Sequence, residues 1–327
     1  MLSRVAESIY WMMRYIERAE NMARLIDVNL TLTLDLPEET ESQWRAVVTT
    51  TGDIAAFDAA YPKVTSDAVI EFLVFDEENP NSVYRCLRAA RENARSVREI
   101  ISSEVWEQIN QFYLMITTTR YRSALDAPSE FFQQVRLSSH LIEGVINGTM
   151  SHGESWHFAR LGRLLERGEQ TARLLDTKYF LLLPSPEYVG STVDDIQWSA
   201  VLRSASAFEM YRKRHGRVEP HRVVEFLLLN RLFPRATHYC VIQSDESLHQ
   251  ISGSPVGSFH NAGERELGRL RGEFAFSEAS DIISGGLHEY LDHLQTKFSR
   301  VGTGIQETFF GLRPAVTDDT TTPAANE

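Results

Sequence analysis

The sequence predicts an all-α protein, a multi-helix bundle built from two pseudo-symmetric, related halves. Apolar residues recur at helical spacing along most of the 327 residues, whereas the sustained alternation of a half-buried strand is rare. Nothing alternates strand with helix, as a doubly wound sheet requires. An internal repeat, described below, adds the division into halves.

The predicted helices follow one another with short breaks. The first covers residues 3–33 with Ser3 as a candidate N-cap, and the brief alternation over 30–36 is interpreted as the end of this helix. Helices are then expected at 42–60 and 66–75, and a long amphipathic helix at 82–103. The remaining helices are expected at 104–123, 128–150, 154–182, 195–214, 219–230, 234–249, 260–276 and 278–300. Turn residues at 184–186 and 252–255 mark the clearest stops.

The composition is that of a globular chain with a core of its own. It is 43% hydrophobic and 24% charged, and at this length a core needs no disulfide or metal. Cys86 and Cys240 lack a CxxC partner, which predicts reduced thiols. No apolar run approaches the roughly 20 residues of a membrane span, and the N-terminus does not resemble a secretory signal. We therefore expect a cytoplasmic location and no membrane contact.

Residues 14–27 repeat at 163–176 without gaps. Eight of the fourteen positions are identical at a constant offset of 149, including both arginine–glutamate patterns. A period this long indicates duplication of a domain half, not a solenoid. The expected organisation is a first half over 1–149, a second half over 150–312, and a disordered tail over 313–327 that is rich in Thr, Pro, Ala and acidic residues.

Each copy of the repeat forms a mixed Arg/Glu ladder on one side of its helix. In the first copy the polar residues fall within about 140° of one another at 100° per residue. One interpretation is a solvated face with weak helix-stabilising pairs. The other places both ladders together at the pseudo-twofold axis as a buried or cleft-lining network, with Glu17 and Glu166 as candidate acid–base residues.

A second arginine stripe follows the 82–103 helix. Arg85, Arg88, Arg91, Arg95 and Arg98 share one side. The stripe is either a solvated face or a row of guanidinium groups for a phosphate, an acidic peptide or an acidic partner. The loop before it contains Asn79, which either helps to start the helix or assists anion binding there.

The charge distribution argues against a general nucleic-acid binder. The formal net charge is −12, whereas nonspecific phosphate binding usually needs a basic domain. Of the 33 basic residues 29 are arginines, which reflects either a GC-rich genome or selective use of bidentate guanidinium groups.

The sequence predicts neither a metal nor a cofactor. His152 and His157, like His288 and His293, are five residues apart and do not share a helical face. Cys240 has a histidine nearby but no third member of a triad, so a buried structural thiol is expected. HExxH, Walker, GxGxxG and GxSxG motifs are missing from the sequence.

Several motifs in order resemble the alpha-E family, a bacterial all-helical family named for a repeated Glu-Arg motif. They lie in the order Met1–Arg4, Tyr10-Trp11, Arg14–Glu20, Phe75-Asp76, Asn79-Pro80, Ser82-Val83, Arg91–Arg95, Trp106, Asn110, Gly148–Met150, Trp156, Leu161–Arg163, Glu166-Arg167, Trp198, Phe226-Leu227 and Phe233–Arg235. The similarity spans roughly 1–312. Where the family usually has Ser after Pro-Arg, this chain has Ala236, so that hydroxyl is not required here.

The resemblance implies which proteins this chain works with more clearly than which reaction, if any, it catalyses. Alpha-E proteins are typically encoded or fused beside circularly permuted ATP-grasp ligases and transglutaminase-like cysteine peptidases, which implies peptide- or amide-bond chemistry. One hypothesis is an accessory helical subunit that binds an acidic or phosphate-bearing ligand or the ligase itself. The alternative is an enzyme in which Glu17 or Glu166 acts beside arginines that hold a carboxylate or oxyanion. The predicted ligand-binding residues are Arg14, Glu17, Arg18, Glu20, Arg24, Arg163, Glu166, Arg167, Glu169, Arg173, Asn79, Arg88, Arg91 and Arg95.

Overall fold

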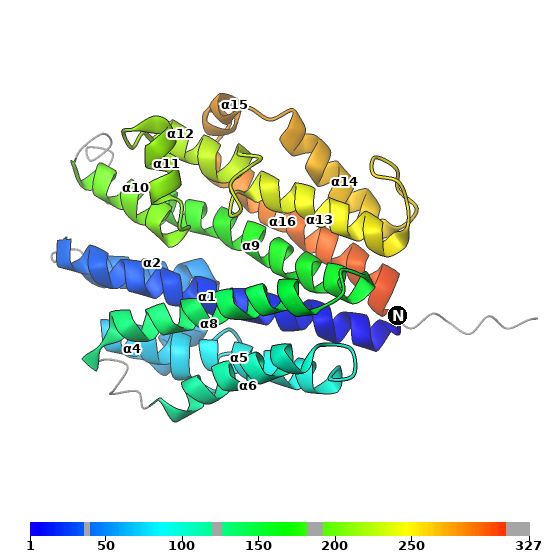
Figure 1. Ribbon diagram of the computed structural model, residues 1–327. Helices are drawn as coiled ribbons and strands as arrows, with labels where there is room; N and C mark the ends of the chain where they lie inside the picture. Colours follow the sequence, from blue (N-terminus) through cyan, green and yellow to red (C-terminus); the bar gives the residue numbers. More distant parts are fainter. Residues whose placement is uncertain (36–39, 120–125, 182–191, 312–327) are drawn as a thin grey trace, which may run out of the picture.

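The computed structural model is all-α, as predicted, and describes residues 1–35, 40–119, 126–181 and 192–311. Two long helices, α1 (Ser3–Asp35) and α9 (Glu154–Leu181), lie side by side through the middle of the molecule (Figure 1). Most helices of the predicted first half pack on α1 and most of the second half pack on α9, but α2 (Thr40–Thr51) lies mainly against α9 and α10 (Thr192–Ser204) mainly against α1. The predicted disordered tail lies outside the described residues.

The other long helices of the first half pack on α1 or on one another (Figure 1). Helix α5 (Val83–Ser96) and helix α8 (Pro128–Thr149) contact α1 directly, and α6 (Ser103–Thr118) packs on α5 and α8. The shorter elements are α2 (Thr40–Thr51), α3 (Ile54–Ala60), α4 (Ser66–Ile70) and the π-helical turn η2 (Glu71–Phe75).

The second half covers α9 with α13 (Thr237–Ser252) and α16 (Leu287–Ile305). The other elements of this half are α10 (Thr192–Ser204), α11 (Phe208–His215), α12 (Pro220–Val224), η4 (Glu225–Leu229), α14 (Ala262–Ala275), α15 (Ala279–Ser284) and η5 (Gln306–Phe310). Buried apolar residues from Ala6 to Phe310 form one continuous cluster, so the two halves share a single core.

Three predicted helices are each broken in two by local backbone geometry. The 42–60 helix breaks at Gly52 (φ +82°), and the 278–300 helix breaks at Gly286 (φ +101°), both in the left-handed region that glycine tolerates best. The 195–214 helix breaks at Ser206, which adopts φ +50°. These kinks are set by a single residue each and leave the apolar periodicity intact on either side, which is why periodicity alone joins the segments.

The predicted 82–103 helix is too long. Helix α5 ends at Ser96, because Ser102 must leave the helical conformation to cap α6, where its side chain accepts a hydrogen bond from the Val105 backbone N–H. Arg98 therefore lies in the turn after α5, with its guanidinium 4.9 Å from the Trp106 ring centroid. The stripe of five arginines does not continue along one helix.

Candidate functional site

The site begins where α1 and α9 approach each other most closely. A Cβ atom on Gly162 would lie 2.2 Å from the backbone oxygen of Tyr10, far inside contact distance. Position 162 must therefore be glycine for the two helices to come this close. This close approach brings the two copies of the Glu-Arg motif into contact.

The two motifs pair reciprocally. Arg167 of α9 donates two hydrogen bonds to the Glu17 carboxylate of α1, at 2.9 and 2.8 Å. Arg18 of α1 donates in the same bidentate way to Glu166 of α9, at 2.7 and 3.1 Å. Each glutamate is 1% exposed. The expectation that the duplicated rows meet in the interior is thus confirmed, and the solvated-face interpretation is wrong for these pairs.

The amides that follow each motif extend the correspondence. Asn21 donates to Glu17 at 3.3 Å, and Gln170, offset by 149, donates to Glu166 at 3.1 Å. One turn further, Arg24 pairs with Glu20, and Arg173 pairs with Glu169 at 2.8 Å. A pseudo-twofold axis that relates the two halves requires matched contacts of this kind. The axis itself stays a prediction.

The arginines at the start of each motif differ in their partners. Arg14 bridges the two acids of the second copy, with 2.7 Å to Glu166 and 2.8 Å to Glu169. Its counterpart Arg163 instead pairs with Glu143 of α8 at 2.5 Å. The predicted arginines and glutamates of both ladders therefore join the network, although the first arginine of each copy has different partners. The aspartates that end the two copies pair elsewhere, Asp27 with Arg136 and Asp176 with His288.

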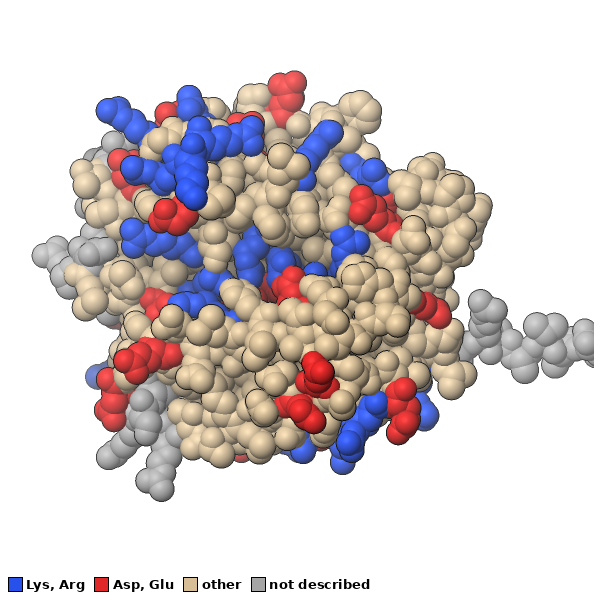
Figure 2. Space-filling model, viewed as in Figure 1, with Lys and Arg blue, Asp and Glu red and all other residues tan. Residues whose placement is uncertain are grey.

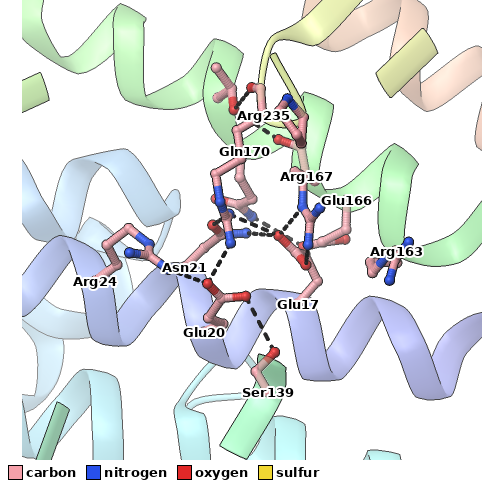
Figure 3. Close-up of polar contacts among 12 residues, drawn as sticks. Glu17, Glu20, Asn21, Arg24, Ser139, Arg163, Glu166, Arg167, Gln170 and Arg235 are labelled. Carbon is pink, nitrogen blue, oxygen red and sulfur yellow. Dashed lines mark hydrogen bonds and ion pairs between the residues drawn. The ribbon is translucent and has the colours of Figure 1, made fainter. Parts of the chain in front are cut away.

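Residues outside the repeat complete the first-copy side, and the sequence analysis missed them as site residues (Figure 3). Arg235, in the loop before α13, donates to Glu17 at 3.1 Å and to Glu20. From α8, the Ser139 hydroxyl donates to Glu20 at 3.3 Å, and His140 lies 3.1 Å from the same carboxylate.

A weaker second repeat is the signal that could have identified Arg235. Residues 71–86 match residues 225–240 at an offset of 154, with five of sixteen positions identical, and Arg235 corresponds to Asn81. Each segment starts with a π-helical turn, η2 or η4, a feature often found at functional sites.

The arginines keep the buried acids ionised. Burial alone would raise the pKa of Glu166, but the guanidinium groups of Arg14 and Arg18 lower it to about 2. Burial likewise opposes ionisation of Glu20, yet Arg235, His140 and Arg24 hold its pKa well below the usual range. In turn, Glu17 and Glu143 raise the pKa of Arg167 against the effect of its burial.

Two pockets flank the network. The larger, of about 260 Å³, is lined by Asn81 together with residues of α1, α2 and α9: Arg18, Asn21, Met22, Leu25, Thr50, Thr51, Glu166, Glu169, Gln170 and Arg173. The smaller, of about 30 Å³, contains Arg235. We name them the Asn81 pocket and the Arg235 pocket.

The other predicted site residues lie apart from the network. The Asn79 side chain is buried and serves its own loop, because it donates to the Phe72 carbonyl at 3.0 Å and accepts from the Asn81 backbone at 2.9 Å. Arg91 is bonded to Asn110 of α6 at 2.7 Å, whereas Arg88 and Arg95 are exposed.

The cysteines have the environment of structural thiols. Both are buried and unpaired, and burial raises the pKa of each to about 12, so neither is a ready nucleophile. Within the described residues no group of three or more His, Cys, Asp or Glu side chains is placed to hold a metal ion. In the same part of the chain no helix combines the length and apolar character that a bilayer crossing requires.

Comparison with known proteins places these features in a family. Uncharacterised proteins of Mycobacterium bovis and of two strains of Mycobacterium tuberculosis are 25% identical over 312 residues, which cover 89% of this chain and 34% of theirs. The chain thus spans about a third of the length of these curated relatives. No solved structure matches it significantly. A family model named Alpha-E, described as a predicted alpha-helical domain with a conserved ER motif, matches residues 1–310. With its two Glu-Arg pairs interlocked at the centre of an all-helical bundle, the chain belongs to the alpha-E family.

Proposed function

We propose that this protein acts by binding, as a helical accessory subunit of an ATP-grasp-linked system that makes or modifies peptide or amide bonds. The observation that carries the proposal is the engagement of the central acids by arginines. The link to an ATP-grasp-type ligase or a transglutaminase-like protein comes from the family's usual neighbours.

The geometry favours binding over acid–base catalysis by Glu17 or Glu166. A general base works best when its pKa lies near the operating pH, whereas the pKa of Glu166 is about 2. Both oxygens of Glu166 and both oxygens of Glu17 already accept hydrogen bonds from arginines. Glu166 therefore takes up no proton at neutral pH, and neither carboxylate reaches a substrate without breaking its ion pairs.

The central arginines are equally committed to internal partners. Arg14 donates from its three nitrogens to Glu166, Tyr10 and Glu169. Arg18 donates from its three nitrogens to Glu166 and Asn81. An acidic or phosphate-bearing partner therefore needs arginines elsewhere.

Such arginines gather over α10, α11 and α12 (Figure 2). Residues 203–231 contain seven Lys or Arg and three Glu, a formal charge of +4 in a chain whose total is −12. The exposed members form what we call the basic surface: Arg203, Arg212, Lys213, Arg214, Arg217 and Arg231. A pocket of about 270 Å³, whose charged lining residues are Arg214, Arg231 and Glu225, has room for a carboxylate or a phosphate beside the two arginines. We assign the acidic or phosphate-bearing partner to this surface.

Co-expression with an ATP-grasp ligase of the type that usually neighbours the family tests the proposal. We expect the ligase to copurify with the native chain, less so as salt rises, and to be lost when Arg212, Lys213 and Arg214 are changed to Glu. The matched control is Arg88→Glu, Arg95→Glu and Arg98→Glu, which reverses three exposed arginines on the other predicted surface. If the ligase is retained by the variant changed at residues 212–214 and lost by the variant changed at residues 88, 95 and 98, the binding site lies on and beside α5. Turnover by the isolated chain that Glu166→Gln abolishes, with the fold intact, would overturn the binding role.

A further inference from the structure

The loops that carry Asn81 and Arg235 have the same backbone design. The Asp76 carboxylate accepts hydrogen bonds from the backbone of residues 78 and 79, at 2.7 and 3.4 Å. Asn230, 154 positions later, accepts from residues 232 and 233 at 2.8 and 2.9 Å. Such side-chain-to-backbone bonds fix a turn, so Asn81 and Arg235 occupy equivalent places after it.

The partners of Arg235 have counterparts around Asn81. Arg235 contacts Glu17, Glu20 and Asn21 of α1. At the offset of 149 these residues correspond to Glu166, Glu169 and Gln170, and all three line the Asn81 pocket. Arg14 already donates to Glu166 and Glu169, whereas its counterpart Arg163 pairs with Glu143 instead. The space that Arg235 occupies beside Glu20 and Asn21 is nevertheless open beside Glu169 and Gln170.

The walls of the two pockets also correspond. Both lie between the α1–α9 pair and the end of a neighbouring helix, and their matched wall positions are Met22 and Thr171, Leu25 and Leu174, Thr50 and Ser204, and Thr51 and Ala205. The Arg235 pocket measures about 30 Å³ and the Asn81 pocket about 260 Å³. Replacement of the long arginine by a short asparagine accounts for the difference.

The charges favour a cation in this space. Asn81 is neutral where the second half has an arginine, and Asp53 stands where the second half has Ala207. The Asp53 carboxylate accepts from the Asn81 amide at 3.0 and 3.2 Å, beside the pocket. These two exchanges add two negative charges, and Arg14 offsets one of them, because it donates to Glu166 and Glu169 whereas its counterpart Arg163 pairs with Glu143. Arg18 and Arg173 do not exclude a cation, because their counterparts Arg167 and Arg24 already accommodate Arg235 around Glu17 and Glu20.

We propose that the Asn81 pocket binds a guanidinium group supplied from outside the chain, either on a small molecule or on an arginine side chain of a peptide. The group lies beside Glu169 and Gln170 and donates to the Glu169 carboxylate and the Gln170 side-chain carbonyl, as Arg235 does to Glu20 and Asn21. It does not donate to Glu166, because Arg14, Arg18 and Gln170 already supply two hydrogen bonds to each oxygen of that carboxylate. This site is distinct from the basic surface and selects the opposite charge.

Calorimetric titration of the full chain with methylguanidinium tests the proposal, with tetramethylammonium as a cation of equal charge that lacks N–H donors. We expect saturable binding of methylguanidinium alone, weakened at least tenfold by Asn81→Arg, which fills the pocket from within. Thr51→Met narrows the same pocket without a change in charge and is likewise expected to weaken methylguanidinium binding. It replaces Asn81→Arg in the test if that variant does not fold. Arg235→Asn opens the equivalent space and is expected to add a second site.

Two further probes identify the source of the guanidinium and the sign of the charge. Tighter binding of an acetylated, amidated Gly-Arg-Gly peptide than of L-arginine assigns the pocket to a partner's side chain, and the reverse assigns it to a small molecule. No binding of any guanidinium probe by the native chain, or binding of inorganic phosphate that Asn81→Arg strengthens, would overturn the proposal. Neither result depends on ligase capture by the basic surface, so the two proposals fail separately.

Discussion

Each central glutamate of this molecule is charged, buried and held by an arginine from the other copy of its motif. Burial of an ion pair often adds little net stability, because loss of hydration offsets the attraction. Removal of one partner is costly, because an uncompensated charge then stays inside. The reciprocal pairs therefore specify how α1 and α9 dock more than they strengthen the fold.

The acid response of stability follows from the pKa of Glu166. Its pKa falls from an ordinary 4.5 to about 2 on folding, so its contribution is present above pH 4.5 and is lost as the pH drops toward 2. The shift corresponds to about 3 kcal/mol. Chemical unfolding measured between pH 6 and 2 is expected to show this loss, and Glu166→Gln is expected to flatten it. The exposed Glu99 provides the control, since Glu99→Gln is expected to leave the pH profile unchanged.

At the scale of elements, the contact of α1 with α9 depends on the missing side chain at Gly162. Gly162→Ala would push a methyl group into the Tyr10 carbonyl and separate the helices, at a cost of about 1–3 kcal/mol. Gly144→Ala in α8 is the matched control, because nothing lies within 4 Å of its added Cβ. That change is expected to stabilise the protein by about 0.5–1 kcal/mol, as alanine usually does in a helix. Equal midpoints of denaturation for the two variants would contradict the close-contact interpretation.

Helices were predictable from this sequence because their apolar faces repeat every three or four residues over long stretches. The ends of α5 and the breaks at Gly52, Ser206 and Gly286 were not, because each is decided by one residue's backbone conformation or by a cap. The π-helical ends η2, η4 and η5 keep an apolar pattern and so were predicted as ordinary helix or left unassigned.

For the molecule as a whole, one core and one ion-pair network join the two halves. We expect thermal unfolding to be a single cooperative transition, and separately expressed segments 1–149 and 150–312 to stay unfolded alone. Each segment would expose the face of α1 or α9 that the other covers. Calorimetry and circular dichroism of the full chain and of both segments check this, and two resolved transitions would show that the halves are independent.

The site was predictable to the extent that it is duplicated in the sequence. An exact offset of 149 identified the Glu-Arg rows, and the weaker repeat at an offset of 154 points to Arg235. Ser139 and His140 reach Glu20 from α8, and no repeat in the sequence marks them. The arginine stripe after Asn81 showed the opposite limit. The periodic spacing continues past the end of α5, but tertiary contacts hold Arg91 and Arg98 against α6, and Arg88 and Arg95 face outward.

The reciprocal wiring has a consequence for how such a chain can evolve. In most duplicated proteins each copy is free to drift once the other retains the function. Here the glutamate of each copy pairs with the arginine of the other copy. A substitution in one motif therefore leaves a buried charge unpaired in the other, and selection acts on both motifs together. The two duplicated motifs are therefore retained, and a glutamate and its partner arginine can be replaced only together.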